Sequence, residues 1–384
     1  MPASEIPAKT LPTPESFTGS TVYKPGPSTA ELALLVVFSF VLFVSVVSFL
    51  RGYITAVDAF GDSPAYMNVA SAIRTWQFDL VVKQFWGLPY AMAALSKLTG
   101  LSDRTALLIW SLLPSLFAVL LARHLWNGWT AAYFAILNFD WLQRSCLGGS
   151  EPLFVCALLA SFAAVRRNRW LLASLLASFA TTVRPLGIFA LVGIGLALLW
   201  KRDYRRFAAA TAIGLTVGVL YSLPMAIHFG NPLANVSNYH SKEWAGGWLF
   251  GIPFYAIVKG TWIHPAPWTN LILSFGWIVL VSAGVILMLK RAEFRTYCRQ
   301  HIVETLFLVP YLWCLFSYNY PVWARSNFAR FAIPILPFVY LAIHPWLPKD
   351  RRILWGLAAV GSVLAASSAL GVTNVLHLLK IRIG

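Results

Sequence analysis

Apolar runs of roughly twenty residues recur along most of the chain, and they constrain its fold more than any single motif does. Only 11% of the 384 residues are charged and the mean hydropathy is +0.67, whereas a soluble domain carries about 25% charged residues. Backbone polar groups inside a bilayer must be satisfied within the chain, so each run is expected to form a helix. We therefore predict an all-α integral membrane protein, a polytopic bundle of about eleven transmembrane helices. The runs cover residues 32–50, 105–125, 129–142, 152–165, 170–183, 186–200, 207–228, 271–289, 302–316, 331–346 and 353–379.

The first 30 residues contain no apolar run and are rich in proline, serine and threonine, a composition typical of disordered segments. A secretory signal would begin with a short basic region, but here Glu5, Glu15 and Glu31 precede the first run. We expect residues 1–30 to be a disordered cytoplasmic tail and residues 32–50 to be an uncleaved first membrane helix. Residues 31–384 are then predicted to form a single membrane domain.

Two longer segments separate the apolar runs, at residues 51–103 and 229–270. In the first, residues 64–80 and 85–98 are too short or too polar to cross a bilayer, and we predict an amphipathic juxtamembrane helix in each. Basic clusters at residues 166–169, 201–206, 290–295 and 349–352 all fall on one side under the eleven-helix count. Basic loops are enriched in the cytoplasm, so this side and the N-terminus are expected to be cytoplasmic, with both long segments outside.

The basic clusters also account for the formal net charge of +16, because such clusters set membrane orientation and contact anionic membrane lipids. We therefore expect no nucleic-acid partner. The cysteines are scattered without a CxxC pair, which argues against a disulfide framework; they are Cys146, Cys156, Cys298 and Cys314. No spacing of His, Asp and Glu resembles a metal site, and we expect neither a metal nor a cofactor.

The side opposite to the basic clusters collects the unusual polar residues. Charged groups at membrane depth are costly and usually face a cavity or a partner. Their convergence predicts a functional site at the non-cytoplasmic membrane face. The candidate residues are Asp58, Asp62, Tyr66, Glu151, Arg184, His240, Lys242, Arg325 and Arg330.

Asp62, in the sequence GDSPAY at residues 61–66, is the first candidate for a catalytic residue. An acceptor hydroxyl that attacks a sugar carbon must lose its proton, and a carboxylate shielded from bulk water can take it as a general base. A structural alternative is that Asp62 caps the helix that begins near Pro64, since aspartate before a proline-led first turn is a common start signal. The two roles are compatible.

The arginines are candidates for binding phosphate, because a guanidinium is a rigid fork that suits phosphate oxygens. Arg184 precedes Pro185 between two short runs, and Arg325 and Arg330 precede the run at residues 331–346. One of Arg325 and Arg330 is expected to reach phosphate, and Arg330 is favoured. The alternative for Arg184 is a side chain that extends to the membrane interface.

Three other positions have weaker functional interpretations. Asp58 lies in the same loop as Asp62, where an aspartate is most often solvated. Glu151 opens a run, where the helix dipole alone favours a carboxylate, or it holds the acceptor or a site arginine. His240 and Lys242 are candidates for contact with a donor substrate or an acceptor substrate. However, such residues in a loop usually form a solvated surface.

Taken together, these residues resemble the GT-C superfamily of integral-membrane glycosyltransferases. The resemblance rests on motifs in the same order: GDSPAY at 61–66, WGLPY at 86–90, SEPLF at 150–154, RPLG at 184–187, and RF at 330–331 before Pro334 and Pro337. The part from Ser150 to Gly187 looks like the mannosyltransferases of glycolipid-anchor synthesis and their bacterial relatives. Ser63 follows Asp62 where many members carry a second acidic residue, and no soluble domain follows residue 346.

The resemblance implies inverting transfer of a monosaccharide from a polyprenyl-phosphate carrier to an acceptor hydroxyl, with Asp62 as the base. The acceptor is a glycan, a lipid or a protein. We expect the periplasmic side of a bacterial inner membrane as the location, because residues 380–384 contain no retention signal. The alternatives are a lipid or lipid-linked sugar transporter or flippase, which usually carries ionisable groups near the bilayer midplane, and a non-catalytic assembly subunit.

Overall fold

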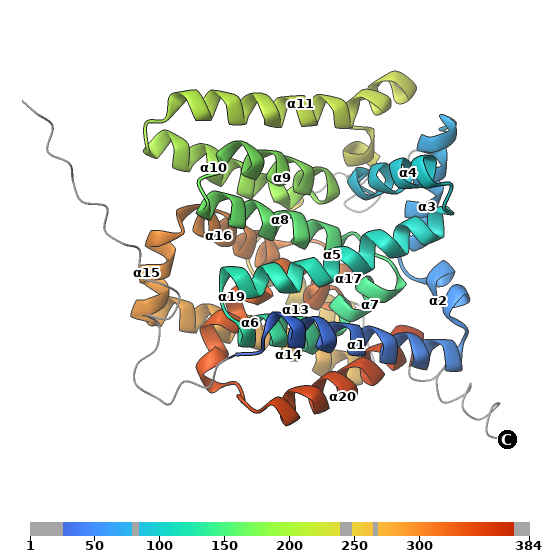
Figure 1. The fold of residues 1–384 in the computed structure, drawn as a ribbon, viewed down its shortest axis with the longest axis vertical. Helices are drawn as coiled ribbons and strands as arrows, with labels where there is room; N and C mark the ends of the chain where they lie inside the picture. The colour runs from blue at the N-terminus through green and yellow to red at the C-terminus, as the bar shows by residue number, and fades with distance from the viewer. Residues whose placement is uncertain (1–25, 79–83, 239–247, 264–267, 372–384) are drawn as a thin grey trace, which may run out of the picture.

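The computed structural model describes residues 26–78, 84–238, 248–263 and 268–371. Within these residues the fold is all-helical, with one isolated β-bridge between Phe250 and Tyr318 (Figure 1). The all-α prediction is confirmed. Most of the predicted N-terminal tail, residues 1–25, and the end of the last predicted run lie outside the described residues.

The first half of the chain contains α1 (Thr29–Leu50), α2 (Tyr53–Ala59), α3 (Ser63–Thr75), α4 (Gly87–Thr99), α5 (Asp103–Leu125), α6 (Gly128–Leu137), α7 (Phe139–Leu147), α8 (Glu151–Arg166) and α9 (Trp170–Val183). The second half contains η2 (Pro185–Gly187), α10 (Ile188–Trp200), α11 (Tyr204–Phe229), α13 (Tyr255–Ile263), α14 (Trp268–Lys290), α15 (Ala292–Gln300), α16 (Ile302–Ser317), α17 (Pro321–Ser326), α18 (Phe328–Ala332), η3 (Ile333–Ile335), α19 (Leu336–Ile343), η4 (His344–Trp346) and α20 (Arg351–Leu370).

Six segments of the described chain are long and apolar enough to cross a membrane: α1, α5, α11, α14 from residue 271, the stretch from α18 to η4, and α20. The pair α7 and α8, bent by 106°, makes a seventh candidate. These helices are consistent with a polytopic membrane protein, but the predicted eleven spans are not confirmed. The reason is length, because α6, α9, η2 with α10, and α16 have only 10–17 residues, and a perpendicular helix needs about 20.

Helix α8 occupies the middle of the bundle, packed between α5 and α9 (Figure 1). Its side chains are buried on nearly every face, from Leu153 to Ala164, as expected of a helix that is apolar all round. Helix α11 is different, since it packs against α9 and α10 along one side and has only two buried residues, Ala210 and Met225. The site described below therefore begins at one end of the most enclosed helix.

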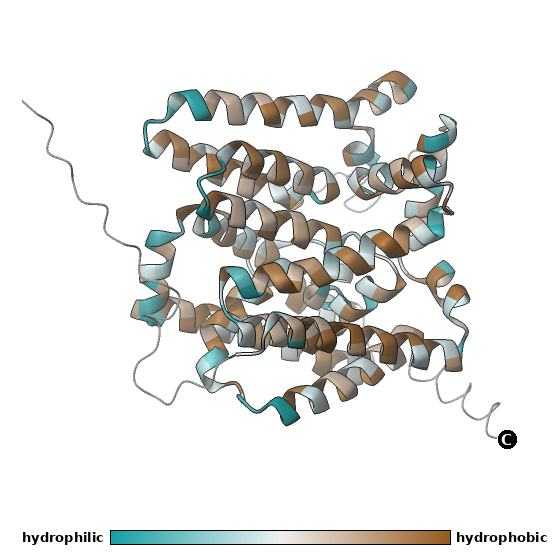
Figure 2. Ribbon diagram, viewed as in Figure 1, coloured by the Kyte–Doolittle hydropathy of each residue, from teal (hydrophilic) through white to brown (hydrophobic). Residues whose placement is uncertain are grey.

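Helices α2, α3 and α4 gather at one end of the bundle (Figure 1). Helices α3 and α4 correspond to the two amphipathic helices predicted at residues 64–80 and 85–98, and they pack against each other and against α5. At the opposite end lie the hydrophilic turns after α8 and α10, together with α15 (Figure 2). The polar groups of the chain are thus concentrated at the two ends of an apolar body.

A buried ion pair lies at the end of the bundle opposite to α3. The guanidinium of Arg166, at the end of α8, donates to both oxygens of Glu304 at 2.7 and 2.9 Å. Glu304, in the first turn of α16, is only 3% exposed and also accepts a hydrogen bond from Tyr297 of α15. The indole of Trp126 donates to the Tyr297 hydroxyl at 2.6 Å. This network joins α8, α15 and α16 at one end of the bundle.

Candidate functional site

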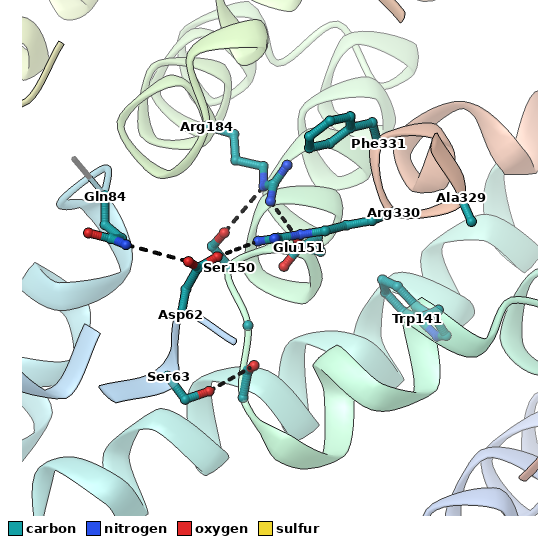
Figure 3. Close-up of polar contacts among 12 residues, drawn as sticks. Asp62, Ser63, Gln84, Trp141, Ser150, Glu151, Arg184, Ala329, Arg330 and Phe331 are labelled. Atoms are coloured by element: carbon teal, nitrogen blue, oxygen red, sulfur yellow. Dashed lines mark hydrogen bonds and ion pairs between the residues drawn. The ribbon is translucent and has the colours of Figure 1, made fainter. Parts of the chain in front are cut away.

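Asp62 stands at the N-cap position of α3, but its side chain makes no capping hydrogen bond. Its Oδ2 instead accepts from Nη2 of Arg330 at 2.7 Å, and its Oδ1 accepts a long hydrogen bond from Gln84 at 3.4 Å (Figure 3). The alternative role as a side-chain cap is therefore absent from this structure. The carboxylate is 28% exposed and lines a cavity, so it is accessible to a bound molecule.

The turn that carries Asp62 is attached to the bend between α7 and α8. Gly61 has φ of +48°, a left-handed conformation that favours glycine. The hydroxyl of Ser63 is buried and donates to the carbonyls of Leu147 and Gly148, at 3.1 and 3.2 Å. Gly148 itself has φ of +100°. These two glycine turns bring the start of α3 beside the start of α8.

Glu151 is the first residue of α8 and is completely buried. Its Oε1 accepts hydrogen bonds from both Arg184 and Arg330 (Figure 3). A carboxylate held by two guanidinium groups is a poor proton acceptor, but it fixes both arginines in place. In the structure Glu151 therefore holds the site arginines. It also lies at a helix N-terminus, where the helix dipole favours a carboxylate.

The two arginines reach Glu151 from different parts of the fold. Arg184 follows the last residue of α9 in an extended conformation, and its Nε donates to the hydroxyl of Ser150 at 3.2 Å. The same hydroxyl accepts from Tyr66 at 3.0 Å. Arg330 lies on the five-residue helix α18 and bridges Asp62 and Glu151. Five of the predicted site residues therefore form one connected network: Asp62, Tyr66, Glu151, Arg184 and Arg330.

The remaining predicted residues are not part of this network. Asp58 forms a bidentate ion pair with Arg104 of α5, at 2.8 and 2.6 Å, and it does not line the cavity. Arg325 is 4% exposed and donates to Ser274 at 3.2 Å, also away from the cavity wall. His240 and Lys242 lie outside the described residues. Of the two C-terminal arginines, the favoured Arg330 is the one in the site.

Sequence reasoning missed a third arginine, Arg144, in the last turn of α7. It is 7% exposed, and its guanidinium lies 4.6 Å from the centre of the Phe60 ring. Its charge interacts with the carboxylates of Glu151, Asp140 and Asp62. The predicted run ends at residue 142, so the sequence pattern does not place Arg144 in a helix. The signal that identifies it is a charged residue within two residues of the end of an apolar run. Gln84 was also missed, since an isolated glutamine carries no pattern.

The cavity beside Asp62 has a volume of about 250 Å³. Its polar wall is formed by the network above and by Gln84, and the rest of the wall is mainly apolar and aromatic. The lining residues are Asp62, Tyr66, Gln84, Phe85, Ser150, Phe154, Val183, Arg184, Pro185, Leu186, Leu249, Phe250, Tyr311, Cys314, Leu315, Tyr318, Trp323, Asn327, Arg330 and Phe331. A molecule with an anionic group and an apolar chain would match both walls.

The charges around the cavity set the protonation of its acid and phenol groups. Burial alone would raise the pKa of Asp62, but the charge and hydrogen bond of Arg330, with help from Arg144, outweigh burial and hold this pKa below its usual value. Burial raises the pKa of Tyr66 to about 12, so its hydroxyl remains a donor. Among the described residues, no group of three His, Cys, Asp or Glu side chains could hold a metal ion.

Comparisons with known proteins do not assign the chain to a family. No protein-family model matches the sequence, and no curated protein matches it. The functional interpretation therefore rests on the residues around the cavity.

Proposed function

We propose that the protein is an inverting glycosyltransferase of the GT-C type, which moves a monosaccharide from a polyprenyl-phosphate carrier to an acceptor hydroxyl. One observation carries the proposal: Asp62 and two arginines face the same cavity, whose remaining wall is mainly apolar and aromatic. This arrangement supplies a proton acceptor, a binding site for phosphate and an apolar surface for an isoprenoid. Polyprenyl-phosphate mannose is the first donor to test.

In this reaction the acceptor oxygen forms a bond to the anomeric carbon while the bond from that carbon to the phosphate oxygen breaks. Asp62 takes the proton of the acceptor hydroxyl, and the polyprenyl phosphate leaves with the electron pair of the broken bond. Arg184 and Arg330 stabilise the negative charge that grows on the leaving phosphate. Inversion follows because the acceptor attacks from the face opposite to the phosphate.

Arg330 has two partners in the structure, and this suggests how a donor would activate the site. The pair with Asp62 keeps the carboxylate in a weakly basic state. A donor phosphate competes with Asp62 for Arg330, and movement of Arg330 toward the phosphate frees the carboxylate to accept a proton. Glu151 keeps its ion pair with Arg184 and stays in place during this change.

The membrane arrangement is part of the same proposal. The seven candidate spans of the described chain, together with the four shorter apolar segments, would give the eleven spans expected from the sequence. The ends rich in basic residues would then face the cytoplasm, and the cavity would face the periplasm of a bacterial inner membrane. Short helices can cross where the bilayer thins locally around them.

The proposal is tested with the purified chain in lipid nanodiscs, radiolabelled polyprenyl-phosphate mannose and a membrane extract as the acceptor source. We expect transfer by the wild type and a loss of 10²- to 10⁴-fold on Asp62→Asn, about the contribution of a general base. Binding of the donor lipid should persist in that variant. Asp58→Asn is the matched control, because Asp58 lies four residues before Asp62, in α2, but pairs with Arg104 outside the cavity.

Full transfer by Asp62→Asn would exclude Asp62 as the base. A chain that moves the labelled lipid across vesicle membranes without consuming it would instead be a transporter.

A further inference from the structure

Arg144 is a buried charge behind the proposed catalytic residue, and it does not line the cavity. Its Nε and Nη1 atoms have no hydrogen-bond partner among the described residues. Buried polar groups are nearly always paired, and an unpaired buried arginine is costly. This arginine therefore calls for a functional explanation.

The position of Arg144 is defined by the two turns that build the site. Its guanidinium lies over the Phe60 ring at 4.6 Å, and a Cβ added to Gly61 would lie 2.8 Å from its Nη1. On its other side, a Cβ added to Gly149 would lie 2.8 Å from its Cβ and Cδ. Arg144 thus touches the two residues before Asp62 and a residue just before Glu151, and it fills the space between the two turns.

The carboxylates whose charges act on Arg144 are Glu151, Asp140 and Asp62, and the two that belong to the site are unevenly matched with arginines. Arg330 is shared by Asp62 and Glu151, while Oε2 of Glu151 is buried without a partner. Arg144 therefore has N–H groups without an acceptor, and Glu151 has an oxygen without a donor. In the same network, Arg330 pairs with two carboxylates, whereas Arg144 pairs with neither of them.

We propose that Arg144 is a positioning residue for Asp62, which holds the Asp62 turn and its negative charge in place while Arg330 binds the donor phosphate. This inference rests on the proposed function. The charged and titratable groups that face Asp62 are Arg330 from α18, Glu151 from α8, Arg144 from α7 and Tyr66 from α3. Once Arg330 turns to phosphate, Arg144 is the positive charge that remains beside Asp62 in this set.

The test measures the protonation of Asp62 directly. The full chain in nanodiscs is treated with a water-soluble carbodiimide and an amine across a pH series, because this reagent modifies protonated carboxyl groups. Peptide mass spectrometry then gives the pH at which half of Asp62 is labelled. The measurement is made without ligand and with saturating decaprenyl phosphate that carries no sugar.

We expect Arg144→Gln to move this labelling midpoint to higher pH, with the larger shift in the presence of decaprenyl phosphate. Arg144→Lys should return the midpoint toward the wild-type value, because it restores the charge. The acid limb of the transfer rate against pH should move in the same direction in each variant. Arg104→Gln is the control, since this arginine is partly exposed and pairs with Asp58, and its midpoint should equal that of the wild type.

A folded Arg144→Gln chain with the wild-type midpoint in both conditions would overturn the inference. If that variant does not fold, Phe60→Leu removes the ring beneath the guanidinium and should shift the midpoint in the same direction. An unchanged midpoint in folded Phe60→Leu would then overturn it. If decaprenyl phosphate does not bind the wild type, the proposed function fails, and the role of Arg144 is decided by the ligand-free midpoints alone.

Discussion

Replacing Glu151 by glutamine tests the centre of the network, because this side chain is completely buried and holds two arginines. The amide has nearly the same shape as the carboxylate but no charge. After the replacement Arg330 keeps its pair with Asp62, whereas Arg184 keeps only the neutral Ser150 hydroxyl. One arginine, not two, is left without a charged partner.

The number of arginines left without a charged partner determines the expected loss of unfolding free energy. Breaking a buried ion pair by removing one partner costs about 3–5 kcal/mol. The side chain of Arg184 is 17% exposed and can form hydrogen bonds with water in the cavity. We therefore expect a cost at the lower end of this range, about 3 kcal/mol. Against a total stability of about 5–15 kcal/mol, this loss is large enough to measure and small enough to leave a folded protein.

The free energy of unfolding is measured by titrating the chain in detergent micelles with a denaturing detergent, with tryptophan fluorescence as the signal. Glu293→Gln serves as the control, because Glu293 is 54% exposed and its nitrogen–oxygen distance to Arg291 is 3.4 Å. We expect no measurable change in that variant. Equal destabilisation of the two variants would refute the assignment of Glu151 as the buried anchor of both arginines.

Three further predictions follow from other parts of the structure. Glu304→Gln should also cost about 3 kcal/mol of stability, since Glu304 is buried in an ion pair, yet binding of decaprenyl phosphate by the folded protein should remain as in the wild type. The pKa of Asp62 is lower in the folded chain than in the unfolded chain, so its pair stabilises the protein at neutral pH; the difference in unfolding free energy between wild type and Asp62→Asn should shrink as pH falls below about 4. Gly87→Ala should cost about 1–3 kcal/mol, because its Cβ would lie 2.6 Å from the backbone of Thr182. By contrast, Gly218→Ala in α11, with nothing within 4 Å, should be neutral or stabilising in the same denaturation assay.

The sequence predicted the all-helical class and the main members of the site because both depend on strong local signals. Charged residues are rare in this chain, so Asp62, Glu151, Arg184 and Arg330 were conspicuous at the ends of apolar runs. The basic clusters placed these ends on one common side. Their direct contact in the structure follows from this shared side and from the turns that join the helices.

Other features depended on pairings that no local pattern encodes. Asp58 and Asp62 are alike in sequence, and only the nearby Arg104 of α5 removes Asp58 from the site. Arg144 was hidden because the bend at residues 148–150 turns the end of α7 back against α8, whereas the sequence suggested a simple loop. The number of spans was uncertain for a similar reason, since a run of 10–17 apolar residues does not define whether a helix crosses the bilayer.

Helix α8 has a buried acid–base contact at each of its ends, Glu151 with Arg184 and Arg330 at one and Arg166 with Glu304 at the other. Its sixteen residues form a rod about 24 Å long. Because an ion pair holds each end of α8, the helix cannot move along its axis without breaking the ion pair at one end. If the proposed lipid donor enters the cavity by a movement of helices, we expect the outer helices, such as α11, to move around a stationary α8.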